Sequence, residues 1–358
     1  MSRVVVGLSG GVDSAVTALL LRQAGHQLTA VFMKNWDDDD DQAYCPAKQD
    51  LQDARSVCER LDIGLQTVSF SAEYWNRVFR HFLDEYQAGR TPNPDILCNQ
   101  EIKFRAFLDY ALDHGADAIA TGHYARLEKN GTTRLLRAVD DRKDQTYFLH
   151  TLNQSQLERS LFPIGHLQKA VVRELAAQAG FRNHGKKDST GICFIGERKF
   201  RDFLERYLPR RPGEIRTLDD EIIGHHHGLM FYTIGQREGL GIGGRKGSDG
   251  KPWYVAGKDP GRNILRVVQG MNHPALFNRR LRTGRLHWIA GSHPTLPLAC
   301  TARIRYRQVD RPCLVTGAAE GSGIVEFREP QRAVTPGQSV VIYDGEVCLG
   351  GGVIEAAM

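Results

Sequence analysis

The sequence has 358 residues, of which 25% are charged, and a formal net charge of +5 at pH 7. It contains no apolar run long enough to span a bilayer, and its seven cysteines show neither CxxC pairs nor the spacing of a disulfide framework. We therefore expect a cytoplasmic protein with reduced thiols, without a membrane partner and without a metal held by cysteine. Residues 201–358 hold 22 Lys and Arg against 16 Asp and Glu, an excess that attracts a phosphate backbone but is also common on proteins that bind no nucleic acid.

The first 120 residues or so alternate strands with helices. The apolar runs predict strands at 4–6, 28–33, 65–70 and within 116–125, and helices at 15–21, 46–61, 74–86 and 102–112. This order predicts an α/β fold with a doubly wound parallel sheet. Ligands of such sheets bind beyond the carboxyl ends of the strands. Residues 7–14, Met33 and the Gly122-His123 pair would meet there.

The rest of the chain changes character near residue 208. Asn130-Gly131 predicts a hairpin turn, and helices are expected near 145–160, 167–180 and 199–207. Beyond them, glycine-rich turns separate short alternating runs such as LMFYTIG and CTARIRY. We predict a catalytic α/β domain over 1–208, a small β-rich linker domain over 209–270, and an antiparallel β-barrel, or a sandwich, over 271–358. The acidic run at 37–41 is expected to be a solvated, mobile loop.

The stretch VVVGLSGGVDSAVTALLL reads as strand, tight turn and helix. Its glycines would let the backbone approach a ligand, and the N-terminus of the helix would offer N–H groups to an anion. The lysine of the GxxxxGK[ST] phosphate loop is absent, and the pattern is not GxGxxG either. A plain turn in which Ser9 or Asp13 caps the helix explains the same residues.

Two cysteines lie in polar, turn-rich stretches. Cys98 follows Asp95 in a proline-punctuated loop just before a helix, whose dipole would lower the pKa of the thiol. Cys193 lies near Lys186 and Lys187, and nearby cations also favour a thiolate. Both cysteines are candidates for reactive thiols, although a small buried apolar side chain is the ordinary role of cysteine.

Two further patterns are weaker. Arg303, Arg305 and Arg307 would alternate along one strand face that could track a phosphate backbone, with Tyr306 opposite. A solvated edge strand fits that pattern equally. The run His225-His226-His227 is expected to be a loop, because no carboxylate is spaced to complete a metal site.

Six motifs in this order, SGGVDS, TPNPDILCN, TGHYA, KDQTYFL, DSTGICFIG and FYTIGQREGLGIGG, resemble those of the bacterial tRNA-specific 2-thiouridylase family. The first of them resembles the loop of the ATP pyrophosphatases known as the PP-loop, an adenine nucleotide alpha hydrolase-like fold. The resemblance runs nearly end to end. It implies an enzyme that adenylates the C2 oxygen of the wobble uridine, position 34, with ATP and Mg²⁺, and then replaces this oxygen with sulfur from a persulfide.

The resemblance also implies roles for individual residues. The catalytic residues would be Cys193 as the persulfide carrier, Cys98 as its partner thiol and Asp95 as an acid or base for the target base. ATP would be bound by Gly7, Leu8, Ser9, Gly10, Gly11, Val12, Asp13, Ser14, Met33 and Gly122. The tRNA would be bound by Asn93, Pro94, Asp95, His123, Lys143, Asp144, Gln145, Arg305, Tyr306 and Gln338. The implied partners are tRNAs of the Glu, Gln and Lys type and a persulfide donor or relay protein.

Two other classes of protein are weighed against this one. An ATP-dependent ligase or amidotransferase with the same loop would act on a small acid and would need neither cysteine. A non-enzymatic sulfur carrier or RNA-binding protein would bind tRNA without releasing pyrophosphate.

Overall fold

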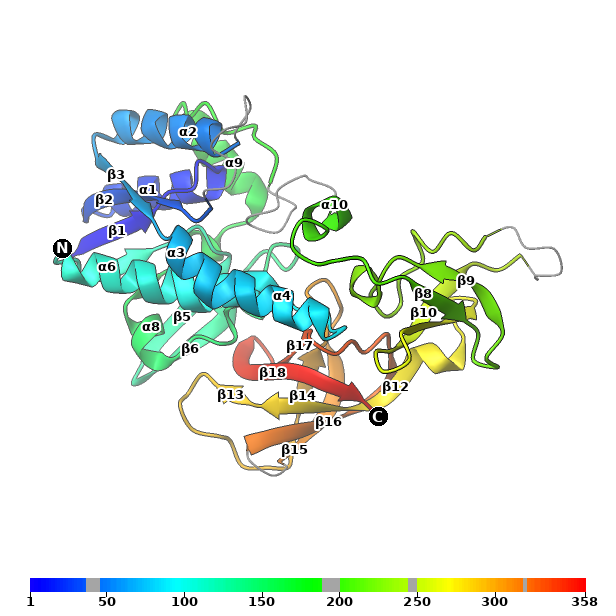
Figure 1. Ribbon diagram of the computed structural model, residues 1–358. Helices are drawn as coiled ribbons and strands as arrows, with labels where there is room; N and C mark the ends of the chain where they lie inside the picture. Colours follow the sequence, from blue (N-terminus) through cyan, green and yellow to red (C-terminus); the bar gives the residue numbers. More distant parts are fainter. Residues whose placement is uncertain (37–45, 189–199, 244–249, 318–320) are drawn as a thin grey trace.

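The computed structural model describes residues 1–36, 46–188, 200–243, 250–317 and 321–358. The acidic run at 37–41 and Cys193 lie outside these residues. The described chain builds three sheets, which follow one another from the α/β part through a small central sheet to a C-terminal barrel (Figure 1).

The α/β part is organised around a parallel sheet with the strand order β3-β2-β1-β4-β7. Its strands are β1 (Arg3–Gly7), β2 (Gln27–Lys34), β3 (Gly64–Ser69), β4 (Ala118–Ala120) and β7 (Ser160–Leu161). Val4 and Val6 pack into one apolar core and Val5 into another. Both faces are therefore covered, which confirms the doubly wound sheet.

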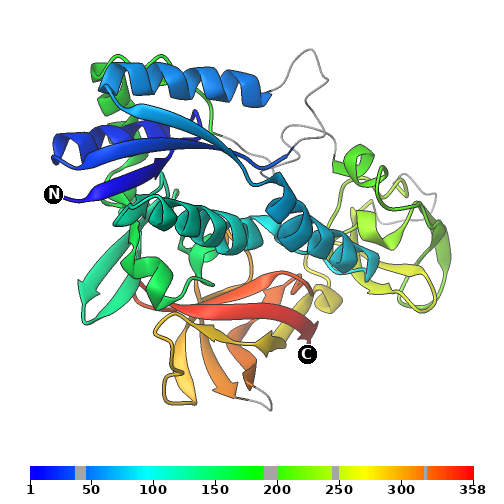
Figure 2. The same ribbon diagram turned by 60° about the vertical axis from the view of Figure 1, so that its left-hand side comes forward.

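Different helices cover the two faces (Figure 2). The face of Val4 packs against α1 (Val12–Gln23), α2 (Pro46–Leu61) and α9 (Lys169–Gln178). The other face packs against two helical segments that each contain a π-helical stretch. One runs through α3 (Ser71–Tyr74), η1 (Trp75–Phe79) and α4 (Arg80–Gln87), and the other through α5 (Pro94–Leu97), η2 (Cys98–Ala106) and α6 (Phe107–Asp113).

The region expected to be helical at 145–160 is more divided. It holds α7 (Thr146–Leu149) and α8 (Gln154–Glu158), and it ends in β7, which pairs with β4. A strand of two residues carries no periodicity, so the sequence did not reveal it. The short helices η3 (Pro163–His166) and α10 (Phe200–Leu204) complete the α/β part.

The central sheet has the order β10-β11-β8-β9. Its strands are β8 (Gly213–Arg216), β9 (Ile222–His226), β10 (Trp253–Asp259) and β11 (Ile264–Gln269). The LMFYTIG run is not the expected strand, because it forms the 3-10 turn η4 (Leu229–Phe231). All three residues of η4 are buried, whereas a strand with one exposed face would alternate. In the histidine run, both ring nitrogens of His226 are hydrogen-bonded to backbone groups, at Asn263 and Gly228.

The C-terminal part is a closed antiparallel barrel. It follows the order β12-β16-β15-β14-β17-β18, and the pairing of β12 with β18 closes it. The strands are β12 (Phe277–Arg285), β14 (Leu298–Arg303), β15 (Arg311–Gly317), β16 (Ser322–Arg332), β17 (Ser339–Asp344) and β18 (Val347–Ala357), with η5 (Pro274–Leu276) before them and β13 (His287–Trp288) paired to β18. Because the barrel is closed, each of its strands has a neighbour on both sides and no edge strand is left exposed.

One hairpin joins the α/β part to the barrel. The predicted Asn130-Gly131 turn connects β5 (Ala125–Asn130) with β6 (Thr132–Arg137). β6 then pairs with β18, where Leu136 faces Val347 and Leu135 faces Cys348. The hairpin is therefore part of the barrel sheet, although its residues belong to the front of the sequence.

No described helix is both long and apolar enough to cross a membrane.

The joint between the α/β part and the barrel also buries a histidine. His150, which is 1% exposed, ends α7 and lies against Gly351 of β18. Burial is the main cause that lowers the pKa of His150 to about 4; the hydrogen bond to the Tyr147 carbonyl opposes this shift, and the nearby His287 adds to it. Because the folded protein keeps this ring neutral, protonation of the unfolded chain below pH 6.5 favours unfolding.

We predict that the free energy of unfolding falls as the pH drops from 7.5 to 5.5. In the variant His150→Asn this fall should be smaller than in wild type. Asparagine can still donate to the Tyr147 carbonyl but does not titrate. The difference should be about 1.4 kcal/mol, which corresponds to about 2 °C in melting temperature for a chain of this length. His166→Asn, at an exposed position, is the control. An equal loss in wild type and His150→Asn would contradict the prediction.

Candidate active site

The loop of residues 7–14 connects β1 to α1 and is held by its own serines. Ser14 Oγ donates to the Gly11 carbonyl at 3.0 Å and lies 3.2 Å from Ser9 Oγ. Gly10 has φ of +78°, and a Cβ there would collide with the backbone of Asp50. The N-cap of α1 is Gly11 and no side chain caps the helix. The interpretation of Ser9 or Asp13 as a cap is therefore wrong, because Asp13 lies inside the first turn.

The side chain of Asp13 is turned toward two partners from other elements. Tyr124 Oη donates to Asp13 Oδ1 at 2.8 Å, and Lys169 Nζ lies 2.6 Å from the same oxygen. Lys169 also reaches Asp188 Oδ1 at 2.7 Å. A lysine is thus present at the loop, and it comes from the first residue of α9 and not from the loop itself.

A second lysine lies on the other side of the loop. Lys186 Nζ binds Asp50 Oδ1 at 2.6 Å and Asp53 Oδ2 at 2.5 Å, and it lies 3.4 Å from the Gly10 carbonyl. Burial lowers the pKa of Lys186, but the hydrogen bonds to the two carboxylates outweigh this effect and raise the pKa overall. The same carbonyl accepts a hydrogen bond from buried Asn183 at 2.9 Å. The segment 183–188 therefore packs against the loop.

Neither lysine was singled out from the sequence as a residue of this loop. Lys169 lies 155 or more residues from the loop, so spacing gave no sign of the contact. The sequence did hold one indication for Lys169. A cation in the first turn of a helix is unfavourable with the helix dipole, so an anionic neighbour is expected there.

The other predicted ATP residues lie around the same loop. A Cβ on Gly122 would lie 2.7 Å from the Ser14 nitrogen, so only glycine fits at the end of β4. A Cβ on Gly7 would lie 3.2 Å from Met33 Cε. The structure thus brings Gly7, Met33 and Gly122 together with the loop, as expected from their places at strand ends.

His123, a predicted tRNA contact, is in the core. It is 7% exposed, its Nδ1 lies 2.8 Å from Thr121 Oγ1, and its ring packs against Phe104. Burial and then the charge of Lys103 hold the pKa of His123 well below its usual range, so the ring is neutral.

The predicted proline loop before Cys98 is in fact the start of a helix. Pro94 occupies the first turn of α5, and Asn93 Oδ1 accepts a hydrogen bond from the Asp95 N–H at 3.2 Å. Proline suits this position because its fixed φ is helical and its missing N–H is not needed. Asp95 is half-buried in the first turn, while Cys98 is fully buried one turn later. The expectation that both residues precede the helix is therefore wrong.

The segment that leads into Asn93 is held by both of the other sheets. The Thr91 N–H donates to the Pro336 carbonyl at 3.0 Å, and Gln338 Nε2 donates to the Thr91 carbonyl at 2.8 Å. Lys258 of β10 donates to the Gly89 carbonyl at 2.8 Å, and burial lowers its pKa to about 8. Gln338, predicted from the far end of the chain, thus lies next to the Asn93-Pro94-Asp95 stretch.

The arginine strand is shorter than predicted. β14 ends at Arg303, and the chain then turns, so Arg303, Arg305 and Arg307 do not share one strand face. Arg305 Nη2 instead donates to the Ile234 carbonyl at 2.8 Å and to Thr335 Oγ1 at 2.9 Å. Tyr306 packs on Phe148, with ring centroids 4.3 Å apart.

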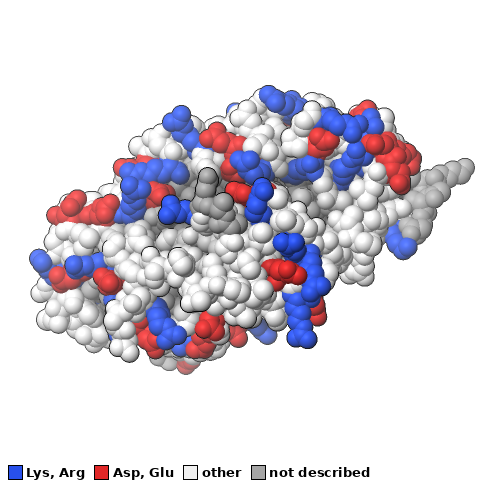
Figure 3. All heavy atoms as spheres, turned by 90° about the horizontal axis from the view of Figure 1, so that it is seen from below, with Lys and Arg blue, Asp and Glu red and all other residues white. Residues whose placement is uncertain are grey.

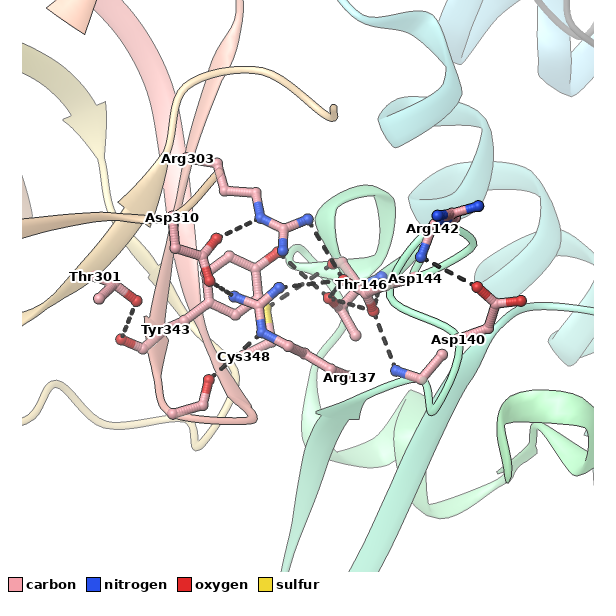
Figure 4. Close-up of polar contacts among 12 residues, drawn as sticks. Arg137, Asp140, Arg142, Asp144, Thr146, Thr301, Arg303, Asp310, Tyr343 and Cys348 are labelled. Atoms are coloured by element: carbon pink, nitrogen blue, oxygen red, sulfur yellow. Dashed lines mark hydrogen bonds and ion pairs between the residues drawn. The ribbon is translucent and has the colours of Figure 1, made fainter. Parts of the chain in front are cut away.

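The three residues of the predicted tRNA contact Lys143-Asp144-Gln145 have different partners in the structure. Lys143 Nζ binds Asp188 Oδ2 at 2.5 Å, and Gln145 Oε1 accepts from the Tyr124 N–H at 2.8 Å. The side chain of Asp144 is 1% exposed and lies between Arg137, at 3.3 Å, and Arg303, at 3.5 Å (Figure 4).

A second carboxylate completes this buried group. Asp310 binds both Arg137 and Arg303, and the guanidinium of Arg137 lies 3.6 Å over the ring of Tyr343. These side chains come from β6, the segment after it and the barrel (Figure 4). Asp144 therefore faces the joint between the α/β part and the barrel. On the outer face of the barrel, seen from below, Lys and Arg are interspersed with Asp and Glu around a broad uncharged centre (Figure 3).

A glycine loop on a doubly wound sheet, with lysines brought to it from other elements, is typical of an α/β enzyme that binds a nucleotide. Family models match in three consecutive pieces: the tRNA methyl transferase HUP domain over residues 2–197, the tRNA methyl transferase PRC-barrel domain over 201–269 and the Aminomethyltransferase beta-barrel domain over 278–354.

Curated relatives match over the whole chain. A protein of Methylobacillus flagellatus named tRNA-specific 2-thiouridylase MnmA is 58% identical over 99% of both chains. A protein of Pseudomonas aeruginosa with the same name is 59% identical over 99% of this chain and 95% of its own. The chain belongs to the family of the tRNA-specific 2-thiouridylases. The solved U34-tRNA thiolase NcsA from Methanococcus maripaludis aligns only distantly, with a TM-score of 0.37 and 19% identity over 58% of this chain and 67% of its own.

We predict that Asp144→Asn weakens the joint between the α/β part and the barrel. The variant leaves buried Arg137 and partly buried Arg303 with one carboxylate, at a cost of the order of 3 kcal/mol. Its melting temperature should fall, and hydrogen exchange should rise in β6 and β18. Asp141→Asn, at an exposed position three residues away, should match wild type. A variant with wild-type stability that has lost only tRNA binding would assign Asp144 to the RNA surface instead.

Proposed function

We propose that this protein is a tRNA uridine 2-sulfurtransferase, an enzyme that uses ATP to convert the wobble uridine at position 34 to 2-thiouridine. The observation that carries the proposal is the match of 58–59% identity, over 99% of the chain, to proteins named tRNA-specific 2-thiouridylase. The loop of residues 7–14, with an anion-ready helix start and lysines beside it, supports ATP as the co-substrate.

The first step activates the base. The C2 oxygen of the uracil forms a bond to the α-phosphorus of ATP, the bond from that phosphorus to the bridging oxygen breaks, and pyrophosphate leaves with the electron pair. The uracil N3 proton is lost to a base, a role we assign to Asp95. Its half-buried carboxylate lies in the first turn of a helix whose N-cap is Asn93. The poor leaving oxygen becomes part of AMP, which is a good leaving group.

The second step brings sulfur. The terminal sulfur of a persulfide on Cys193 attacks C2, and AMP departs with the original oxygen. The thiolate of Cys98 then attacks the sulfur atom of Cys193, so that the electrons of the broken S–S bond stay on the new thiocarbonyl sulfur. This closes a Cys98–Cys193 disulfide, which a thiol reductant reopens. The alternative order, in which Cys98 first releases sulfide, uses the same two residues.

The remaining roles are assigned to the predicted residues. Mg²⁺ suits this site, since it is typically held by one or two carboxylates together with substrate phosphates. Asp13 supplies a partly exposed carboxylate at the loop. The tRNA residues would be Asn93, Pro94, His123, Lys143, Asp144, Gln145, Arg305, Tyr306 and Gln338. His123 and Asp144 are buried, so they would act from beneath the surface. A persulfide donor or relay protein would load Cys193.

We further propose domain boundaries at residues 208 and 270. The five-stranded sheet lies before residue 162, the central sheet within 213–269, and the barrel strands from 277 onward, with the β5–β6 hairpin as the exception. The first unit would bind ATP and carry the chemistry, and the last would bind tRNA. Because the reaction needs tRNA and reduced thiols, we propose the cytoplasm as its compartment.

We expect the protein, incubated with ATP, Mg²⁺, tRNA and a persulfide donor, to form 2-thiouridine and to release pyrophosphate only when tRNA is present. Cys193→Ser and Cys98→Ser should abolish the product and keep tRNA-dependent pyrophosphate release. Cys58→Ser is the matched control, because Cys58 is buried in α2 and burial, then Glu59, raises its pKa to about 11.

The outcomes separate the three classes of protein. AMP formation with a small acid and without RNA would identify a ligase or amidotransferase. Binding of tRNA without pyrophosphate release would identify a non-enzymatic carrier. Full thiolation by both cysteine variants would remove the sulfur relay from the proposal.

A further inference from the structure

The loop of residues 7–14 contains no lysine, yet a lysine lies against it. Lys169 Nζ is 2.6 Å from Asp13 Oδ1 and 2.7 Å from Asp188 Oδ1, and its side chain is 11% exposed. The backbone at this residue is fixed, because the Lys169 N–H donates to Asp140 Oδ2 at 2.9 Å. An ammonium group has three donors. In the part of the chain that the structure describes, its ion-pair partners are these two carboxylates, so the ammonium group can bind a third acceptor.

Two further cations share a carboxylate partner with Lys169. Asp188 also binds Lys143 Nζ at 2.5 Å and Arg173 Nη2 at 3.2 Å. Asp188 thus has three cationic partners, Lys143, Lys169 and Arg173. Burial raises the pKa of Asp188, but the hydrogen bonds from Lys143 and Lys169 outweigh this and hold it below its usual range. Lys169 also begins α9, where the helix dipole disfavours a cation that lacks an anionic neighbour.

We infer that Lys169 is a catalytic residue that binds the β- and γ-phosphates of ATP and stabilises the pyrophosphate as the bond to the α-phosphorus breaks. This rests on the proposed function. The β- and γ-phosphates carry most of the charge of ATP, and the leaving group gains charge in the reaction, so a buried cation acts most strongly there. Lys169 thus supplies from α9 the charge that the GxxxxGK[ST] loop carries within itself.

The test is the equilibrium binding of ATP, pyrophosphate and AMP, each with Mg²⁺, to the full-length protein. Lys169→Ala should weaken ATP and pyrophosphate by about tenfold to hundredfold and leave AMP within about twofold. Lys169→Arg should recover part of the loss. Lys187→Ala removes a positive charge at an exposed position in the same region and should bind all three like wild type.

Two other binding patterns would overturn the inference. In the first, Lys169→Ala and Lys169→Arg weaken the binding of ATP, pyrophosphate and AMP equally and lower the melting temperature. Lys169 would then only hold Asp13 in place. Selective loss of AMP would place the lysine at the α-phosphate. If wild type forms no 2-thiouridine but its variants show the expected binding pattern, the proposed function fails and the role of Lys169 stands.

A second observation lies in the barrel and is independent of the first. Cys300 of β14 and Cys313 of β15 are directly paired in antiparallel register, and their sulfur atoms are 3.6 Å apart. Directly opposed residues of such strands have the spacing that a disulfide requires. Cys300 is half-buried and Cys313 is 8% exposed. The hydrogen bond between them lowers the pKa of Cys300 and raises that of Cys313, so the more accessible thiol is the better nucleophile.

We also infer that Cys300 and Cys313 are an oxidative modification site, which closes to a disulfide with a peroxide or a small-molecule disulfide. The two thiols lose two protons and two electrons. A peroxide takes these up and is reduced to water, or a small disulfide is reduced to two thiols. The bond would join neighbouring barrel strands. A thiol reductant in a thiolation assay would therefore act at two separate places.

The test exposes the full-length protein to oxidised glutathione or hydrogen peroxide and maps cysteine-linked peptides by mass spectrometry. A peptide pair joined through Cys300 and Cys313 should appear, disappear with dithiothreitol and be absent from Cys300→Ser. Cys58→Ser should form it like wild type, and Cys98→Ser should form it too. Oxidation of the other cysteines without this link, or a mixed disulfide that persists on Cys300, would overturn the inference.

Discussion

The structure depends on one buried carboxylate. Asp144 lies between two arginines from different parts of the fold, Arg137 at the end of β6 and Arg303 at the end of β14, and Asp310 closes the group. Buried charges are tolerated only when they are paired. The chain therefore holds these residues together only when the α/β part and the barrel are in one arrangement. The pairing of β6 with β18 beside this group continues the same joint.

This joint positions the candidate chemistry. The segment before Asn93 is held by Pro336 and Gln338 of the barrel and by Lys258 of the central sheet. Asp95 and Cys98 follow directly in the helix that this segment starts. The position of the Asn93-Pro94-Asp95 stretch thus depends on contacts with the barrel and the central sheet, whereas the loop of residues 7–14 is held within the α/β part. The arrangement of the α/β part, the central sheet and the barrel therefore sets the distance between the loop of residues 7–14 and the Asn93-Pro94-Asp95 stretch.

Elements with a strong local sequence pattern were predicted correctly, whereas the points at which some elements begin or end were not. Most strands and helices of the first 120 residues carry strong periodicity and were predicted, and Gly7, Met33 and Gly122 lie close to the loop, as expected from their places at strand ends. The helix through Cys98 was missed because prolines were taken as loop, although Pro94 suits a helix start. The strand through Arg305 was overextended because alternation alone does not mark where pairing stops.

The sequence by itself determined the α/β class, the glycine loop and the set of motifs that identify the family, since each is written in local spacing. Only the tertiary structure decided where the lysine of this loop comes from, and that Asp144 faces a joint and not the surface. The physical reason is that both depend on contacts between residues far apart in the chain, such as Asp13 with Lys169 and Asp144 with Arg303. The pair Cys300 and Cys313 likewise became a dithiol only through strand register.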